Sequence, residues 1–205
     1  MRSADSAPPD PAAPSGSRTG RDEIEIKLPA ADLAAVRARL RDGGATPKSP
    51  EHAEVDDLYD DRERRLSASG RALRLRRAGG RAILTYKGPA RFQAGAKIRE
   101  EREVGVDDPE EAAAILERLG FERRFRYEKR REEWTWEDCV IALDATPIGT
   151  FVEIEGDPAA IRHLVTRLGL DAAEAIPYSY AELYVRRRKE QPSLPPDMVW
   201  ETEKA

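Results

Sequence analysis

The feature that most constrains this chain is an alternation of ionisable and aliphatic residues that recurs along nearly every segment with strand character. Residues 23–28 (EIEIKL) place two glutamates and a lysine between aliphatic residues, and 72–76 (ALRLR) and 151–155 (FVEIE) repeat the pattern. Successive side chains of a strand point to opposite faces. Each of these strands therefore has one ionic face and one aliphatic face.

The order of the predicted elements indicates an α+β fold with one antiparallel sheet. Strands are predicted at residues 22–28, 54–60, 71–77, 82–87, 97–106, 121–136, 140–145 and 150–156. Helices are predicted at residues 30–41, 108–120, 157–168 and 179–188. Hairpin turns such as Gly79-Gly80, without regular βαβ alternation, favour antiparallel pairing. About eight such strands predict a closed barrel with peripheral helices.

Two arrangements of the ionic faces are compatible with this pattern. The ordinary one turns polar faces to solvent and aliphatic faces inward. Here the polar faces are almost wholly ionisable, with little of the Ser, Thr, Asn or Gln that usually dilutes an exposed face. The predicted amphipathic helices also need aliphatic strand faces to cover. We therefore favour an inverted barrel, a tunnel whose lumen is lined by charged side chains.

A charged lumen requires compensation, because an unpaired buried charge is very costly. The predicted lumen provides acidic and basic sets of equal size. The acidic set is Glu23, Glu25, Glu101, Glu103, Asp144, Glu153 and Glu155, and the basic set is Lys27, Arg74, Arg76, Lys87, Arg99, Lys129 and Arg131. Clustered carboxylates suit the hard ions Mg²⁺ or Mn²⁺, whereas Arg and Lys suit phosphate oxygens. A metal-bound polyphosphate would satisfy both sets.

Composition limits the other classes of function. Lys plus Arg is 35 and Asp plus Glu is 39, a formal net charge of -4, which gives no case for general nucleic-acid binding. No apolar run reaches the length of a membrane span, and the single cysteine, Cys139, excludes an intrachain disulfide. One domain is predicted at residues 22–188, between a disordered tail at 1–20 and a loose tail at 189–205. Because no signal-peptide core is found, a cytoplasmic location is expected.

Aromatic and histidine residues give weaker signals. Tyr127, Trp134 and Trp136 have the ring chemistry to stack on a base or a thiazole, but packing of the barrel is the simpler interpretation. His52 and His163 have no partners at metal-ligand spacing, so both are assigned to the surface.

Short motifs in a fixed order give the chain a family resemblance. They are EIEIK (23–27), ALRLR (72–76), LTYKGP (84–89), KIREERE (97–103), YEKRRE (127–132), LDATPIGTFVEIEG (143–156) and SYAELY (179–184). The first resembles the Glu-x-Glu-x-Lys signature of the CYTH family, also called triphosphate tunnel metalloenzymes, and the others resemble its later strands and closing helix. VDDLYDD (55–61) departs from the family's usual Asp-x-Tyr-Tyr-Asp stretch, which leaves the role of Asp56, Tyr59 and Asp60 open.

The resemblance implies a tunnel of antiparallel strands that acts on triphosphates. Family members include inorganic triphosphatases, thiamine triphosphatases and class IV adenylyl cyclases. By this resemblance the metal ligands are Glu23, Glu25, Asp144, Glu153 and Glu155. The implied phosphate-binding residues are Lys27, Arg74, Arg76, Lys87, Arg99, Lys129 and Arg131, and Glu101 and Glu103 are further tunnel carboxylates.

The favoured hypothesis is hydrolysis of a triphosphate-bearing small molecule, namely inorganic triphosphate, thiamine triphosphate or ATP, with Mg²⁺ or Mn²⁺. Glu23 and Glu25 would be catalytic through the metal, and Lys27 is a candidate proton acceptor as well as a phosphate contact. The alternatives are a class IV adenylyl cyclase, which makes cyclic AMP and pyrophosphate from ATP, and a non-catalytic polyphosphate- or nucleotide-binding module. Neither nucleic acid nor a membrane is expected as a partner, and a homodimer stays open.

Overall fold

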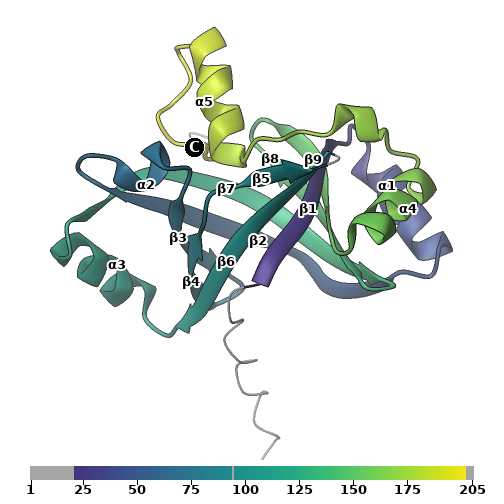
Figure 1. Ribbon diagram of the computed structural model, residues 1–205, viewed down its shortest axis with the longest axis horizontal. Coiled ribbons are helices and arrows are strands. Elements are labelled where there is room, and N and C mark those ends of the chain that lie inside the picture. The colour runs from purple at the N-terminus through teal and green to yellow at the C-terminus, as the bar shows by residue number, and fades with distance from the viewer. Residues whose placement is uncertain (1–20, 94, 202–205) are drawn as a thin grey trace, which may run out of the picture.

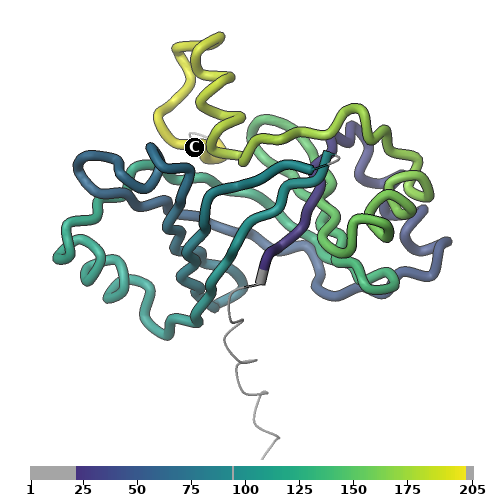
Figure 2. The backbone as a smooth tube through the Cα atoms, in the orientation of Figure 1, coloured from purple at the N-terminus to yellow at the C-terminus, as the bar shows by residue number. Residues whose placement is uncertain are grey.

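The computed structural model describes residues 21–93 and 95–201, in which one curved sheet is flanked by helices (Figures 1 and 2). The strands are β1 (Arg21–Pro29), β2 (Thr46–Asp61), β3 (Ala72–Ala78), β4 (Arg81–Lys87), β5 (Arg91–Gln93), β6 (Ala96–Val106), β7 (Phe121–Trp136), β8 (Cys139–Thr146) and β9 (Gly149–Glu155). The helices are α1 (Leu33–Asp42), α2 (Arg65–Ala68), α3 (Pro109–Arg118), α4 (Pro158–Arg167) and α5 (Tyr180–Glu190), and a 3₁₀ turn spans Ala172–Glu174.

The sheet closes on itself. Antiparallel neighbours follow one another in the order β1-β9-β8-β7-β2-β3-β4-β6, and β6 then pairs with β1. Ile24 lies opposite Ile98 at this closing seam, and Glu23 lies opposite Arg99. The short strand β5 lies beside β6, outside the ring. The structure therefore confirms the predicted eight-stranded antiparallel barrel with peripheral helices.

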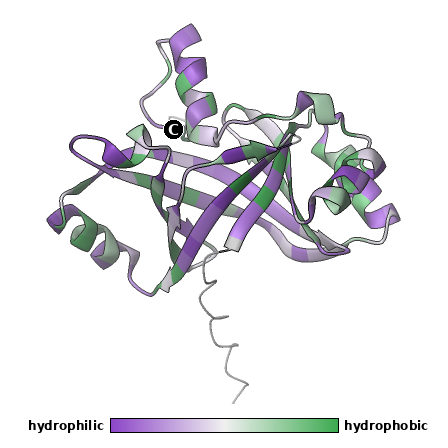
Figure 3. Cartoon of the chain, in the orientation of Figure 1, coloured by the Kyte–Doolittle hydropathy of each residue, from purple (hydrophilic) through white to green (hydrophobic). Residues whose placement is uncertain are grey.

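The largest apolar core lies outside the barrel, between its wall and the helices α1 and α4. Wall residues such as Ile141, Leu143, Val152 and Ile154 meet Leu164 of α4 there, and each is at most 2% exposed. Burial of this kind stabilises the fold by about 25 cal/mol per Å² of apolar surface. Figure 3 shows the resulting pattern, with purple and green alternating along the strands. The aliphatic strand faces thus point outward beneath helices, as expected for an inverted barrel.

Local sequence signals explain where the helices and one hairpin form. Asp108 and Asp157 accept hydrogen bonds from first-turn N–H groups of α3 and α4, and each is followed by a proline. Ser179 starts α5 with a capping box. Gly79 and Gly80 have φ angles of 54° and 77°, which suit the tight turn predicted between β3 and β4. These signals fix the ends of elements that the barrel then brings together.

α5 stands at one end of the barrel, drawn in yellow in Figure 1. Its residues Tyr180 and Tyr184 pack with Tyr127, Phe151 and Met198 in a second apolar cluster. A third cluster lies beneath α3 on the outer face of β3. The cluster at α5 reaches the barrel interior, because the Tyr180 hydroxyl donates to Asp144 at 2.7 Å.

The C-terminal segment differs from the loose tail predicted for residues 189–205. Met198 is fully buried, its N–H donates to the Arg126 carbonyl at 2.9 Å, and its own carbonyl accepts from the Glu128 N–H at 2.9 Å. The Tyr184 hydroxyl also donates to two carbonyls of this segment. The prediction was wrong for the described part of the tail, because one methionine in a polar stretch produces no periodic signal.

Other boundaries also differ from the expectation. β2 begins at Thr46 rather than at residue 54, because it pairs with β7 from its first residue to its last. Two elements lie where neither a strand nor a helix was predicted, namely α2 after β2 and β5 after β4. The predicted disordered tail at 1–20 lies outside the described residues. None of the helices in the described part of the chain is long and apolar enough to cross a membrane.

Candidate functional site

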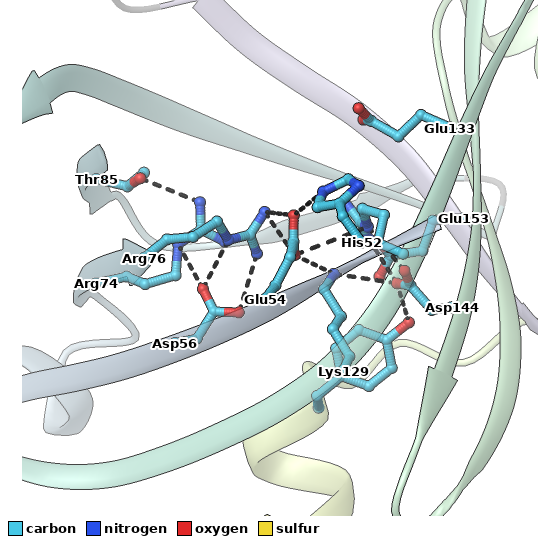
Figure 4. Close-up of polar contacts among 12 residues, drawn as sticks. His52, Glu54, Asp56, Arg74, Arg76, Thr85, Lys129, Glu133, Asp144 and Glu153 are labelled. Carbon is cyan, nitrogen blue, oxygen red and sulfur yellow. Dashed lines mark hydrogen bonds and ion pairs between the residues drawn. The ribbon is translucent and has the colours of Figure 1, made fainter. Parts of the chain in front are cut away.

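The ionic strand faces point into the barrel, where side chains of opposite charge pair with one another. Figure 4 shows part of this network, with acidic and basic side chains converging on one another. Asp56, Lys129 and Asp144 are at most 2% exposed although each is ionisable. Burial of charge to this degree is tolerated only with close partners. The interior is therefore ionic, as the strand alternation predicts.

Asp144 on β8 joins several of these pairs. It accepts hydrogen bonds from Arg131 Nε (2.7 Å) and Nη2 (2.6 Å), from Lys129 Nζ (3.1 Å) and from the Tyr180 hydroxyl (2.7 Å). Arg131 also pairs with Glu153 of β9. Burial acts to raise the pKa of Asp144, but Arg131 and Lys129 outweigh it and the pKa is lowered. Its neighbours therefore hold Asp144 as a carboxylate at neutral pH.

Glu54 and Asp56 of β2 hold the two arginines of β3. Arg76 donates to Asp56 from Nε at 2.8 Å and to Glu54 from Nη1 at 3.1 Å. Arg74 lies 3.4 Å from Asp56 and donates to the Thr85 hydroxyl at 3.1 Å. Burial acts to raise the pKa of Glu54, but the surrounding lysine and arginines lower it well below its ordinary value. The two guanidinium groups are thus fixed in place by buried carboxylates.

Lys27 and Lys97 neutralise carboxylates where β1 meets β9 and β6. Lys27 Nζ lies 3.2 Å from Glu153 and donates to the Tyr178 carbonyl at 3.0 Å. Lys97 Nζ lies 2.6 Å from Glu25. Burial lowers the pKa of Lys27, although Glu153 acts in the opposite direction. Lys27 is therefore a buried ammonium that releases its proton more readily than a solvated lysine.

Glu23 on β1 lies among like charges. Burial raises its pKa to about 8, and the nearby carboxylates of Glu101 and Glu155 act in the same direction. Lys87 pairs with Glu101, yet burial lowers the pKa of Lys87 to about 8, and Arg74 adds to that effect. A carboxyl group whose pKa is raised by burial and, next, by neighbouring carboxylates marks a position where a cation is favoured.

Arg99 and Glu103 have different surroundings from the other predicted site residues. The Arg99 guanidinium donates to the carbonyls of Gly70 (3.0 Å) and Gly88. These bonds connect Arg99 to the segment just before β3 and to the residue just after β4. Glu103 accepts from the Thr85 hydroxyl at 2.8 Å and lies 3.3 Å from Arg74. The structure therefore places Glu103 in the ionic network and Arg99 beside it.

The residues predicted to bind metal come from three adjacent strands, β1, β9 and β8. Among the described residues, no three or more carboxylate, histidine or cysteine side chains are gathered closely enough to hold an ion, and cations pair with several of these carboxylates instead. The donor chemistry nevertheless fits a divalent ion, because carboxylate oxygens suit Mg²⁺ and Mn²⁺. The like charges around Glu23 would also be relieved by a cation. The candidate ligands are Glu23, Glu25, Asp144, Glu153 and Glu155.

Sequence reasoning left the role of Asp56 open, and it missed Glu54, Lys97 and Tyr180 as interior residues. Glu54 and Asp56 share one face of β2, and Lys97 has the same strand parity as Arg99, so the alternation carried a signal for all three. Tyr180 reaches the interior from the start of α5, and strand parity gives no signal for it. The sequence thus predicts which face of a strand a side chain lies on, but it does not predict that a residue at the start of a helix reaches the barrel interior.

The aromatic and histidine assignments have mixed outcomes. Trp134 and Trp136 lie in the outer core and Tyr127 lies in the cluster at α5, which confirms packing as their role. His52 is not a plain surface residue, because its Nε2 lies 3.5 Å from Glu54 and its side chain is 25% exposed. The side chain therefore sits at the margin of the ionic network.

A closed antiparallel barrel whose interior interleaves carboxylates with arginines and lysines defines a class of charged tunnel barrels. The sequence profile of the CYTH domain matches residues 21–180 of this chain. The chain therefore belongs to the CYTH domain family, and membership implies dependence on a divalent metal ion.

Relatives and solved structures agree with this placement. The chain is 32% identical over 134 residues to a Methanocaldococcus jannaschii protein named "Putative adenylate cyclase" (65% of this chain, 75% of the relative). It is 28% identical over 177 residues to adenylate cyclase CyaB of Aeromonas hydrophila (80% and 89%). A Vibrio parahaemolyticus structure that is also called a putative adenylate cyclase aligns with TM-score 0.71 and 22% identity (82% and 99%). A Hippeastrum protein with a cyclase designation, described as having a dominant triphosphatase activity, aligns with TM-score 0.59 and 21% identity (85% and 98%).

Proposed function

We propose that the chain is a metal-dependent hydrolase of triphosphate compounds, which it binds inside the barrel. The observation that carries this proposal is the interleaving of acids and bases in one buried interior, as at Arg131, Asp144 and Glu153. An interior that bound only anions would have no use for a matching set of acids. A polyphosphate with divalent ions carries charge of both signs. Its phosphate oxygens can pair with the basic side chains, and its metal ions can pair with the acidic ones.

Each set of side chains has its own task in this proposal. The cations would bind phosphate oxygens and stabilise the negative charge on the transferring phosphoryl group, often the largest catalytic effect. They are Lys27, Arg74, Arg76, Lys87, Arg99, Lys129 and Arg131. The carboxylates Glu23, Glu25, Asp144, Glu153 and Glu155 would hold the divalent ion, Mg²⁺ or Mn²⁺. When bound, that ion supplies Lewis-acid polarisation of phosphate oxygens.

Lys27 is the candidate for proton transfer. Its pKa is lowered by burial, and its ammonium lies beside Glu153. A lysine that loses its proton readily can accept one from an attacking water, whereas a protonated lysine binds a phosphate oxygen. Lys27→Arg separates these roles, because arginine keeps its charge. Loss of kcat with retained substrate affinity supports proton transfer, and an unchanged kcat supports a phosphate contact.

The second candidate is a class IV adenylyl cyclase, which the names of the two curated relatives favour. It would hold the triphosphate in the same way while the 3′-hydroxyl of ATP attacks the α-phosphorus. The Hippeastrum protein is called a putative adenylyl cyclase and is described as having a dominant triphosphatase activity, so the names of relatives do not distinguish a cyclase from a hydrolase. We favour hydrolysis because Tyr127 and Tyr180, two aromatic residues beside the ionic network, are buried in packing and are not free to stack on adenine.

One experiment separates these functions. The purified protein is incubated with Mg²⁺ or Mn²⁺ and, in turn, with inorganic triphosphate, thiamine triphosphate and ATP. Orthophosphate release supports the hydrolase, cyclic AMP with pyrophosphate supports the cyclase, and binding without turnover supports a non-catalytic module. The variant Glu23→Gln/Glu25→Gln should lose metal-dependent turnover and stay folded. Glu100→Gln is the matched control, because Glu100 is exposed and pairs with Arg102 outside the barrel. Full activity of the double variant would refute the metal-ligand assignment.

A further inference from the structure

Lys97 on β6 pairs with a carboxylate that the proposed function gives to the metal ion. The strands β6 and β1 lie side by side at the seam that closes the barrel (Figure 1), and Lys97 is in register with Glu25 there. The Lys97 ammonium donates to Glu25 Oε1 at 2.6 Å. Hydrogen bonds between two charged groups are stronger than those between neutral groups. A lysine therefore occupies one side of a candidate metal ligand.

Further carboxylates lie around Glu25 on β1 and β9. Glu155 of β9 is in register with Glu25, and Glu153 lies two residues away on the same face. Glu23 shares that face on β1. Burial and Glu153 act to raise the pKa of Glu25, but Lys97 and two further lysines outweigh them and lower it. Lys97 thus supplies positive charge at a place where acids of two adjacent strands repel one another.

The pair of Lys97 and Glu25 is closer to solvent than the ion pairs of Asp144 and Glu153. The side chains of Lys97 and Glu25 are 16% and 26% exposed, against 6% for Lys27 and 0% for Asp144. An ammonium group is strongly hydrated and sits on a flexible four-carbon chain, so its charged end can turn to water while its methylene groups stay on the wall. Lys97 can therefore leave its partner at a lower desolvation cost than Lys27.

Lys27 and Arg131, which also pair with candidate metal ligands, are each fixed by more than one partner. Lys27 lies 3.2 Å from Glu153 and donates to a backbone carbonyl before α5 at 3.0 Å. Arg131 pairs with Asp144 and Glu153 at once. Moving either group breaks several bonds in a buried network. Of these three cations, Lys97 is the one that a divalent ion can displace with the least rearrangement.

Resting on the proposed function, we infer that Lys97 is the resident counter-ion of the metal site, which pairs with Glu25 until a divalent ion binds and then turns to solvent. Lys97 is a positioning residue in this role, because it acts on the ion through Glu25. Its presence weakens metal binding, since the ion has to replace a pair that is already made. Removal of Lys97 should therefore tighten binding of the ion and lower the stability of the metal-free protein.

The test compares Lys97→Met with Lys48→Met, which removes a lysine 3.4 Å from Glu133, a carboxylate outside the candidate ligands. Mn²⁺ alone is titrated by calorimetry, and melting curves are recorded with and without it. The dissociation constant of Lys97→Met should fall about tenfold, an effect between those of exposed and buried ion pairs, while Lys48→Met stays within about twofold. Without metal, Lys97→Met should melt below the parent protein, and Mn²⁺ should raise its melting temperature by more. Lys97→Arg keeps the charge and should bind Mn²⁺ as the parent does.

A second background isolates the pair. Glu25→Gln should bind Mn²⁺ more weakly than the parent, and adding Lys97→Met to it should change the affinity by less than about threefold, because the carboxylate for which lysine and ion compete is gone. A full tenfold gain in that background would mean that Lys97 acts by general repulsion, and it would overturn the inference. If Lys97→Met does not fold, Lys97→Gln carries the same prediction.

The outcomes separate this inference from the function on which it rests. Equal Mn²⁺ affinity of the parent and Lys97→Met overturns the inference and leaves the hydrolase standing, and so does an equal gain in Lys48→Met, which assigns the effect to overall charge. Unchanged Mn²⁺ affinity with weaker binding of inorganic triphosphate would make Lys97 a phosphate contact instead. Absence of Mn²⁺ binding to the parent and the variant also overturns the inference. If inorganic triphosphate is then hydrolysed equally well with a chelator, or not at all, the proposed function fails as well.

Discussion

Replacing Arg131 with methionine tests whether the fold depends on its interior ion pairs. Arg131 donates to Asp144 at 2.7 and 2.6 Å, pairs with Glu153, and has a side chain that is 12% exposed. Removing one partner of a buried pair costs about 3–5 kcal/mol, because the other charge stays buried. Asp144 keeps Lys129 and Tyr180 as partners, so we expect the lower end, about 3 kcal/mol. At about 2–4 °C per kcal/mol for a chain of this size, the melting temperature falls by roughly 6–12 °C.

Arg130 provides a matched control one residue away. It lies on the opposite face of β7, it is exposed, and its guanidinium lies 5.9 Å from the centre of the Trp200 ring. Arg130→Met removes the same charge and introduces the same side chain, but a surface change of this kind usually stays within about 0.5 kcal/mol. Thermal unfolding of the two variants in one buffer makes the comparison. Equal falls in melting temperature would refute the assignment of the ionic strand faces to the interior.

The effect of Arg131→Met has a predicted pH dependence. Against the effect of burial, Arg131 helps to keep the pKa values of Asp144 and Glu153 below their ordinary values. Carboxylates with a lowered pKa stabilise the fold above their unfolded-state pKa, about 4, and lose that contribution as the pH falls. The difference in free energy of unfolding between variant and parent is therefore largest near pH 7 and shrinks below about pH 4. Urea unfolding at both pH values measures it, and a gap that widens in acid contradicts this reasoning.

Three further predictions follow from single contacts. Met198→Ala should lower the free energy of unfolding by about 2–5 kcal/mol, because the side chain is fully buried, and no change in urea unfolding would mean that the C-terminal segment is loose. Glu54→Gln should reduce the fall in the free energy of unfolding between pH 7 and pH 3, because a carboxylate with a lowered pKa loses its stabilising contribution as the pH falls below its unfolded-state pKa. If the variant loses as much stability in acid as the parent does, the ion pairs of Glu54 do not stabilise the fold. Asp56→Asn should raise the KM for inorganic triphosphate about tenfold, because Arg76 loses a charge-assisted bond of 2.8 Å that aligns it; steady-state kinetics with an unchanged KM would contradict this.

Strand parity made most of the barrel predictable from the sequence. The period of two in a strand assigns each residue to one of two faces, and it does so without knowledge of neighbouring strands. β7 was predicted over the residues that it occupies, 121–136, and its ionic face with Lys129 and Arg131 was predicted to point inward. The same parity covered Glu54, which belongs to no quoted motif, and Lys97, which begins the quoted motif at 97–103 but was not assigned to the site.

The partners of each charge were not predictable in the same way. Parity gives a face but not a register, so the sequence could not tell that Asp144 lies opposite Arg131 while Glu153 reaches Lys27. The hydrogen bond that reaches Asp144 from outside the strands comes from Tyr180, the first residue of α5. Helix periodicity describes a helix face and says nothing of which barrel end the first turn meets. Pairing of separate elements is a property of the assembled fold, and a local pattern does not carry it.

The paired state of the interior determines how a ligand has to bind. Arg131, Asp144 and Glu153 already satisfy one another, so an anion that displaces only a carboxylate would leave that carboxylate buried and uncompensated. A cation alone would do the same to Arg131. No charge is left buried and unpaired only when phosphate oxygens replace the carboxylates as partners of Arg131 and a divalent ion replaces Arg131 as the partner of the carboxylates at the same time. The proposed function therefore predicts that the affinity for phosphate and the affinity for metal are coupled through these pairs, each strengthening the other by the same factor.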